Sequence, residues 1–552
     1  MGSAVMLSSI IPVALLCALA FASSARALLQ DERPHANIRR IPSIPPIEMT
    51  GLDGPVISRN GTRLPPYTTV YYFDQLIDHK NPSLGTFKQR YWHTYEFYER
   101  GGPIILMTPG ENNAQGYSSY LSNMSIGGLI GKCLFITMLD GVDVVSAQQQ
   151  NGSTIMLEHR FYGFSNPKPD LSVASLKYHT IQQAIDDLVY FANHVHLPMP
   201  NGNQLSPSYA PWVLVGGSYS GALTSWTMAN KPGVFWAGYA SSAVVEAILD
   251  FWQYFEPIRE HMPQNCSADI QAVIHYADKI STSRDTKKIE EFKDIFGMGD
   301  VTHFDDVVST LRNNLADWQS LQPSSGPGTV FYQFCDALEV ENGVSASKHG
   351  WGLEHALNAW GSFYKRFYLQ YLCGTQTPEA CVGTYNRSQS NGTGTAVNNS
   401  ARSWTWIVCN EVGYLQDAAP PGVPSLISRL VQPSYDLRQC QLLFPSAFPQ
   451  LPHIQTQRIN KVYKGWNVQN RRLFFANGKR DPWRESTMSA GPVKVRSTAE
   501  QPIMLGNGFH CSDLKTINGQ VDQTVHAVQT SALGYMKIWL AEWTPPREGI
   551  ST

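Results

Sequence analysis

Hydrophobic and polar positions alternate in two patterns along the first half of the chain. Short apolar runs bounded by Gly, Pro and Asn are typical of buried strands. Between them, 180–195 (TIQQAIDDLVYFANHV) and 222–229 (ALTSWTMA) have the apolar spacing of helices. Strands alternating with helices predict a mostly parallel sheet with helices on both faces. The strands expected in this half are 103–107 (PIILM), 133–139 (CLFITML), 154–157 (TIML) and 212–215 (WVLV).

The second half begins with a different pattern. From about residue 250 to 440 the apolar spacing is helical, as in ADIQAVIHYADKI, and no convincing strand occurs. Strand patterns return at 472–476 (RLFFA) and 502–505 (PIML), before a last helix at 523–543. The pattern therefore predicts an α/β core that is split by an inserted helical subdomain, the cap. The expected units are core residues 67–249 and 441–552, and a cap at 250–440.

The first 66 residues have the composition of a secreted precursor. Residues 1–27 hold an apolar run followed by small residues, and the run is too short to span a bilayer, so we interpret them as a signal peptide. Residues 28–66 are Pro-rich and aperiodic, which is typical of an extended arm or a propeptide. Arg39-Arg40 is either a processing site or an ordinary exposed pair.

Cysteines and glycosylation sequons agree with secretion. Removal of the signal peptide leaves eight cysteines, and an even number in a secreted chain favours disulfides, whose pairing stays open. We expect them to concentrate in the cap. Cys511 either anchors its loop through a disulfide or is a buried free thiol. The Asn-x-Ser/Thr sequons are Asn60, Asn123, Asn151, Asn265, Asn386, Asn391 and Asn398.

Composition and charge exclude several classes of protein. The 552 residues are 43% hydrophobic and 16% charged, which excludes a disordered chain. The formal net charge of -2 provides no field that would attract nucleic acid. His194 and His196 have no third ligand in their neighbourhood, so a surface loop is the better interpretation than a metal site. No cofactor or metal is expected.

Ser218 stands at the tip of a strand, a Gly-rich turn and a helix, WVLV-GGSYSG-ALTSW. This is the context of a nucleophile elbow, which exposes a serine hydroxyl at the carboxyl end of a strand. Ser220 occupies the place of the second glycine of G-x-S-x-G, and it is the weaker candidate nucleophile because Ser218 precedes it where a glycine belongs. The alternative is a Gly-rich turn with incidental serines.

Two further residues complete a catalytic triad in the order Ser, Asp, His. Asp481 follows the strand RLFFA, and His510 follows the strand PIML, so both lie at carboxyl ends of strands, as Ser218 does. An oxyanion hole needs two amides. We expect Tyr219 to provide the first, and the loop TPGE after the strand PIILM to provide the second at Gly110 or Glu111; the alternative is that TPGE is only a turn.

Several motifs together carry a family resemblance. They are LEHRFYG (157–163), VGGSYSGAL (215–223), QFCDA (333–337), CNEVGYLQ (409–416), NGKRDPW (477–483) and GFHCSDL (508–514). The chain resembles the secreted and lysosomal serine peptidases that include Pro-Xaa carboxypeptidase and dipeptidyl peptidase II, and it shares most with fungal acid prolyl endoproteases.

The resemblance implies what the enzyme does. It implies an α/β-hydrolase fold, Ser218 as nucleophile with Asp481 and His510, and cleavage after proline at acidic pH. It favours an endopeptidase, with a Pro-Xaa carboxypeptidase or a dipeptidyl peptidase as alternatives, and secretion, with a vacuolar or lysosomal lumen as alternative. A lipase or esterase shares the fold and triad, whereas a non-catalytic binding protein would have lost a triad member. Candidate pocket residues are Trp404, Trp406, Glu411 and Trp483.

Overall fold

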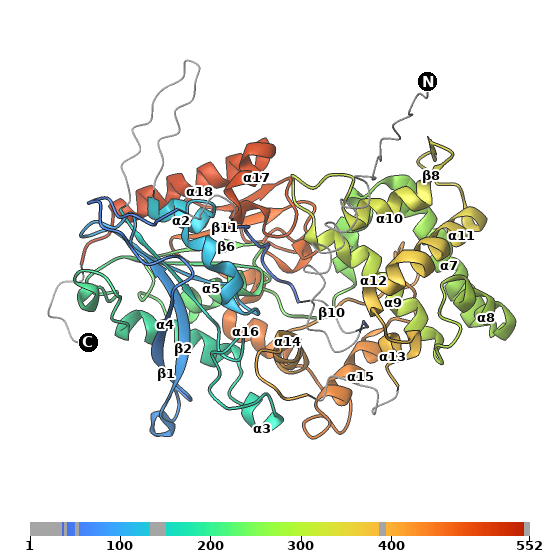
Figure 1. Ribbon diagram of the computed structural model, residues 1–552, viewed down its shortest axis with the longest axis horizontal. Helices are drawn as coiled ribbons and strands as arrows, with labels where there is room; N and C mark the ends of the chain where they lie inside the picture. Colours follow the sequence, from blue (N-terminus) through green and yellow to red (C-terminus); the bar gives the residue numbers. More distant parts are fainter. Residues whose placement is uncertain (1–35, 38–40, 50–53, 133–150, 386–393, 546–552) are drawn as a thin grey trace, which may run out of the picture.

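The computed structural model describes residues 36–37, 41–49, 54–132, 151–385 and 394–545 (Figure 1). Several predictions lie outside these residues: the signal peptide, the strand at 133–139, Arg39-Arg40, and the sequons at Asn386 and Asn391. Among the helices that the structure does describe, none combines the length and the apolar composition needed to cross a bilayer.

Among the described residues, eight strands form one mixed sheet in the order β1-β2-β4-β3-β5-β6-β11-β12. From β4 to β12 all neighbours are parallel, and β1 and β2 form an antiparallel edge. The predicted parallel sheet is therefore confirmed. The strands are β1 (Val70–Leu76), β2 (Thr86–Thr94), β3 (Ile104–Thr108), β4 (Ser153–Leu157), β5 (Trp212–Gly217), β6 (Ala237–Ser241), β11 (Leu473–Gly478) and β12 (Ile503–Gly506).

Helices cover both faces of this sheet, and each face has its own apolar core. Along β3, Ile104 and Leu106 pack with α4 and α5, whereas Ile105 and Met107 pack with α2 and α18 on the other face. This follows from the alternation of side chains along a strand. The core helices are α2 (Ile126–Lys132), α3 (Val173–Leu176), α4 (Ile181–His194), α5 (Tyr219–Asn230), α16 (Thr456–Tyr463), α17 (Thr516–Val521) and α18 (Gln523–Ala541).

The predicted helical insertion is present, and its helices α7 to α13 gather on one side of the molecule, at the right of Figure 1. Four short strands inside it or at its boundary were not expected: β8 (Val340–Glu341) pairs with β9 (Val344–Ser345), and β10 (Gly413–Leu415) pairs with β7 (Ile248–Asp250). The helices are α6 (Glu256–His261), α7 (Gln264–Ser283), α8 (Thr286–Ile295), α9 (Phe304–Ala316), α10 (Val330–Glu339), α11 (Leu353–Phe363), α12 (Leu369–Cys373), α13 (Pro378–Val382), α14 (Ser400–Ile407) and α15 (Pro433–Leu443).

Three disulfides connect elements of the insertion, as its cysteine content predicts. Cys266 is bonded to Cys335, Cys373 to Cys381, and Cys409 to Cys440. The hypothesis of a disulfide at Cys511 is wrong, because this residue is a buried free cysteine. Its loop is fixed instead by hydrogen bonds, such as that from the Cys511 amide to Ser242 Oγ (2.9 Å).

The described part of the N-terminal arm contacts both the insertion and the core. The Ala36 amide donates to the Cys381 carbonyl (3.0 Å), and Gln439 Nε2 donates to the Asn37 carbonyl (2.7 Å). Further along the arm, Ile44 is buried in the core that contains α2 and α18, and Ser119 Oγ donates to the Ile47 carbonyl (2.8 Å). The described segments 36–37 and 41–49 therefore contact the insertion and the core, respectively.

Candidate active site

Ser218 lies between β5 and α5 in a sharp turn. Its backbone has φ 58° and ψ -126°, a conformation that L-residues rarely adopt and that is typical of a nucleophile elbow. The Ser218 amide donates to the Ser241 carbonyl on β6 (2.9 Å). Gly217 has to be small, because a Cβ there would lie 2.7 Å from Ile44 Cγ2 of the arm. Neighbouring strands and the arm thus hold the strained turn.

Ser220 explains the departure from the G-x-S-x-G pattern. Its Oγ donates a hydrogen bond to the Thr108 carbonyl at the end of β3 (2.6 Å). The hydroxyl therefore ties the start of α5 to β3. In contrast, Ser218 Oγ is buried and has no hydrogen-bond partner among the described residues. Of the two serines, Ser218 is the one with a free hydroxyl.

His510 and Asp481 form a buried hydrogen-bonded pair. Asp481 lies three residues after β11 and His510 four residues after β12, at the carboxyl ends of these parallel strands. The two atoms His510 Nδ1 and Asp481 Oδ1 are 2.9 Å apart. The same oxygen accepts from the Trp483 amide (2.8 Å). Because the carboxylate accepts, Nδ1 carries the hydrogen, and in the neutral form of the ring Nε2 keeps its lone pair.

The electrostatics of this pair favour a basic imidazole. Burial by itself would lower the pKa of His510, but the Asp481 carboxylate and the neighbouring Cys511 together override burial and raise that pKa well above the ordinary value. Within the part of the chain that the structure describes, His510 Nε2 has no hydrogen-bond partner. Like the Ser218 hydroxyl, it is available, although no hydrogen bond joins these two groups in the structure.

The loop after β3 and the start of α5 face each other at the elbow. The loop after β3 turns at Gly110 (φ 72°), where a Cβ would lie 3.2 Å from the Ser220 Cβ. On the other side, Tyr219 is the first residue of α5, and such a residue has an amide without an intrahelical partner. The side chain of Ser218 makes no cap hydrogen bond to these amides. The close approach at Gly110 therefore brings the two expected sources of oxyanion amides together.

Besides its candidate oxyanion amide, Glu111 has an unusual side chain that the sequence did not indicate. Its side chain is fully buried, and neither carboxyl oxygen has a hydrogen-bond partner among the described residues. Burial raises the pKa of Glu111 well above its ordinary value, although its own amide and His510 act in the opposite direction. The carboxyl therefore favours the protonated, neutral form.

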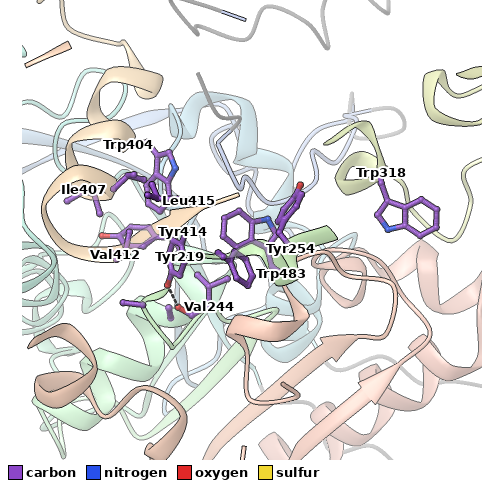
Figure 2. Close-up of a cluster of buried hydrophobic side chains, with 14 of the residues drawn as sticks. Tyr219, Val244, Tyr254, Trp318, Trp404, Ile407, Val412, Tyr414, Leu415 and Trp483 are labelled. Atoms are coloured by element: carbon purple, nitrogen blue, oxygen red, sulfur yellow. Dashed lines mark hydrogen bonds between the residues drawn. The ribbon is translucent and has the colours of Figure 1, made fainter. Parts of the chain in front are cut away.

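Aromatic side chains from the core and the insertion cluster beside these loops (Figure 2). The Trp483 ring lies 6.3 Å from the His510 ring and 5.4 Å from the Tyr414 ring. Tyr414 donates its hydroxyl to the Val244 carbonyl (2.5 Å), the dashed line in Figure 2. Trp404 makes an edge contact with Tyr219, at a ring distance of 5.3 Å. Trp404 and Trp483 therefore lie near the candidate triad.

The other two candidate pocket residues have different surroundings. Trp406 packs against Phe444 and Phe448, at ring distances of 5.2 and 6.0 Å. Glu411 Oε2 accepts from the Ile181 amide at the start of α4 (2.9 Å). Burial raises the pKa of Glu411 to about 7. Trp406 therefore contacts the segment that follows α15, and Glu411 contacts the start of α4.

The sequence did not single out two residues of the insertion that hold the Asp481 loop. Trp318 Nε1 donates to the Arg480 carbonyl (2.7 Å), and Gln319 Oε1 accepts from Trp483 Nε1 (2.8 Å). The two bonds lie on either side of Asp481 in the chain. No sequence signal identifies such a contact, because about 160 residues separate its two sides.

Comparison with protein families identifies the family of the chain. The model of the family described as Serine carboxypeptidase S28 matches residues 75–531. The chain belongs to this family. The resemblance to the secreted and lysosomal serine peptidases is therefore confirmed, and the chain is a serine peptidase that acts on peptide substrates. Membership also decides against the lipase or esterase alternative.

Relatives of known description agree with the family match. Serine protease vicPa of Bipolaris victoriae is 33% identical over 492 residues, which cover 85% of this chain and 88% of that protein. A probable extracellular serine carboxypeptidase of Arthroderma benhamiae is 29% identical over 82% of this chain and 64% of its own length. The human thymus-specific serine protease is 23% identical over 85% of this chain and 86% of its own length.

Proposed function

We propose that this serine peptidase is secreted and cleaves peptide bonds on the carboxyl side of proline within peptide chains, using Ser218, His510 and Asp481 as its triad. The observation that carries the proposal is the hydrogen bond between His510 and Asp481, at the sheet edge where the strained turn presents a free Ser218 hydroxyl. A base oriented by a carboxylate beside a serine nucleophile is the arrangement that acyl transfer needs.

The proposed reaction has two halves. His510 Nε2 takes the proton of Ser218 while Oγ attacks the carbonyl carbon, and Asp481 stabilises the resulting imidazolium. His510 then gives this proton to the leaving amine, which leaves an acyl-enzyme. In the second half, a water molecule loses its proton to His510 and attacks the acyl carbon, and the proton returns to Ser218.

The developing negative charge needs fixed donors. We assign this role to the Tyr219 amide and to an amide of the loop at Gly110 or Glu111. Support comes from the open amide at the start of α5 and from the close approach of Gly110 to Ser220. Amides at a helix start favour an anion also through the helix dipole.

Specificity for proline is supported by the aromatic side chains around the elbow. Proline has a compact apolar ring and no amide hydrogen, so aromatic walls suit it better than polar partners. We propose Trp404 and Trp483 as such walls, because they lie beside Tyr219 and His510. Trp406 and Glu411 remain proposed members of the pocket.

The cleavage mode rests on the fungal motifs, and a library of proline-containing peptides blocked at both ends tests it. We expect cleavage after proline in the doubly blocked peptides at about pH 4 to 5. If only peptides with a free carboxyl or amino end are cut, a Pro-Xaa carboxypeptidase or a dipeptidyl peptidase replaces the endopeptidase. Cleavage without preference for proline would contradict the substrate specificity.

Raising the pH from about 6.5 to 8 is expected to lower the melting temperature by a few degrees. Glu111, Glu411 and His510 all have pKa values raised above those of the unfolded chain. Their stabilisation is complete below the unfolded pKa and is lost as the pH rises through the folded pKa. His93 and His159, whose pKa values burial lowers, act in the opposite direction, but below about pH 6.5.

Scanning calorimetry across this range measures the effect. Glu111→Gln is the control, because it removes one titrating group and is expected to flatten the dependence. A melting temperature that rises between the two pH values would contradict the account. Because these pKa values are raised, low pH stabilises the folded protein. Low pH also protonates His510, and this slows acylation.

The proposal also covers the signal peptide, the arm, the division into core and cap, and the glycosylation sites. We propose removal of residues 1–27 and a cap at 250–440 over the core formed by 67–249 and 441–552. Residues 28–66 are proposed to act as an arm, in view of the contacts of Ala36 and Ile44. Of the described sequons, Asn60 is exposed, and the others, Asn123, Asn151, Asn265 and Asn398, are partly exposed.

A further inference from the structure

The mechanism above makes no use of the segment Glu158–Arg160, which follows β4. Its outer members form two buried ion pairs. Arg90 contacts both carboxyl oxygens of Glu158 (2.6 and 2.9 Å), and Arg160 Nε contacts Asp187 Oδ2 (2.6 Å). Both charged pairs are bidentate, a geometry that fixes orientation. The backbone of His159, between them, is therefore held on both sides.

The hydrogen-bonding state of His159 follows from its partners. Nδ1 lies 2.8 Å from the Arg160 carbonyl, which only accepts, so Nδ1 carries the hydrogen. Nε2 lies 3.2 Å from the hydroxyl of Tyr219. Burial lowers the pKa of His159 to about 4, so the ring is neutral at pH values above this pKa. Nε2 is therefore the acceptor, and the Tyr219 hydroxyl donates.

This bond reaches the residue directly after the candidate nucleophile. Tyr219 is the first residue of α5, and its ring is buried between Trp404 and Trp226, at ring distances of 5.3 and 6.2 Å. A hydroxyl anchored to the rigid loop after β4 fixes the far end of this ring. It thereby restrains the orientation of the Ser218–Tyr219 peptide, whose amide we assign to the oxyanion.

Glu158 and its partner also contact the residues that follow the loop at Gly110 and Glu111. Its Oε1 accepts from the Ala114 amide (3.0 Å), and its partner Arg90 donates to Asn113 Oδ1 (2.8 Å). Both contacts lie directly after the loop at Gly110 and Glu111. One segment after β4 thus contacts both sides of the proposed oxyanion hole.

We propose that His159 is a positioning residue, which orients the oxyanion amide of Tyr219 through the Tyr219 hydroxyl. The inference rests on the proposed function. Small displacements of an oxyanion donor are costly, because the interaction is worth most in the transition state. Loss of the hydrogen bond should therefore affect the chemical step more than substrate binding.

Tyr219→Phe tests this while keeping the ring and its packing. The expected result is a roughly tenfold lower kcat with KM unchanged within about twofold. Inhibition by a blocked peptide aldehyde ending in prolinal should weaken by the same factor as kcat. Such an aldehyde adds to Ser218: the Ser218 O–H bond breaks and its proton passes to His510, Oγ bonds to the aldehyde carbon, and the carbonyl π bond opens. The former carbonyl oxygen takes the negative charge and occupies the oxyanion hole, or it takes the proton back from His510 to give the neutral hemiacetal.

Tyr162→Phe is the matched control. Tyr162 is buried against the same His159 ring, 5.2 Å away, but its hydroxyl has no hydrogen-bond partner among the described residues. We expect kcat and aldehyde affinity to stay within about twofold of wild type. At His159 itself, Gln keeps an acceptor and Leu does not, so His159→Gln should retain more of kcat than His159→Leu.

The outcomes separate the inference from the proposed function. Unchanged kcat and aldehyde affinity in Tyr219→Phe would overturn the role of His159, as would a change confined to KM or the melting temperature. A wild-type enzyme that cleaves peptides but is not inhibited by the aldehyde would overturn the proposed mechanism, and this inference with it.

Discussion

Ser218→Ala is expected to lower turnover by on the order of 10⁴ to 10⁶, because no other group provides the acyl-enzyme route. The matched control is Ser220→Ala, which removes a hydroxyl two residues away that donates to the Thr108 carbonyl. We expect this control to stay within about tenfold of wild type. Initial rates on a blocked proline peptide measure both. Near wild-type turnover in Ser218→Ala would contradict the assignment.

Asp481→Asn is expected to lower kcat by about 10⁴-fold. The amide has no charge to stabilise the imidazolium, and its NH₂ group favours the wrong tautomer of His510 if it replaces the accepting oxygen. Asp513→Asn is the control, since this buried carboxylate accepts from Tyr239 and Ser241 and not from His510. Circular dichroism and kcat are measured for both variants. Equal losses in the two would mean that Asp481 acts only through folding.

The sequence predicted the elements whose signals are local. The apolar runs at β3, β4, β5, β11 and β12 all correspond to strands, and the helix expected at 180–195 is α4. The helix expected at 222–229 begins earlier, at Tyr219, because the elbow leads directly into α5. Residues that follow strand ends were also predictable, since the ends of parallel strands share one edge.

The missed strands lack such signals. β1 and β2 form an antiparallel edge in which polar and apolar residues mix, and several of their side chains are exposed. β6 (Ala237–Ser241) consists mainly of small residues, although it is fully buried between β5 and β11. In both cases sheet pairing outweighs the local preference. A single sequence does not show that pairing.

The site has the same division between local and distant signals. Ser218, Asp481 and His510 have recognisable flanking turns, whereas the holding contacts of Trp318 and Gln319 join segments far apart in the chain. That Cys511 is a free cysteine could not be predicted from the sequence either. An even cysteine count favours disulfides, but the partner of any cysteine depends on the three-dimensional fold.

Covalent labelling with a fluorophosphonate, followed by mass spectrometry of the digested protein, tests the central claim most directly. The account predicts a single adduct on Ser218, complete loss of peptidase activity when labelling is complete, and no labelling of Ser218→Ala. An adduct on Ser220, or full activity in protein whose Ser218 is completely labelled, would contradict it.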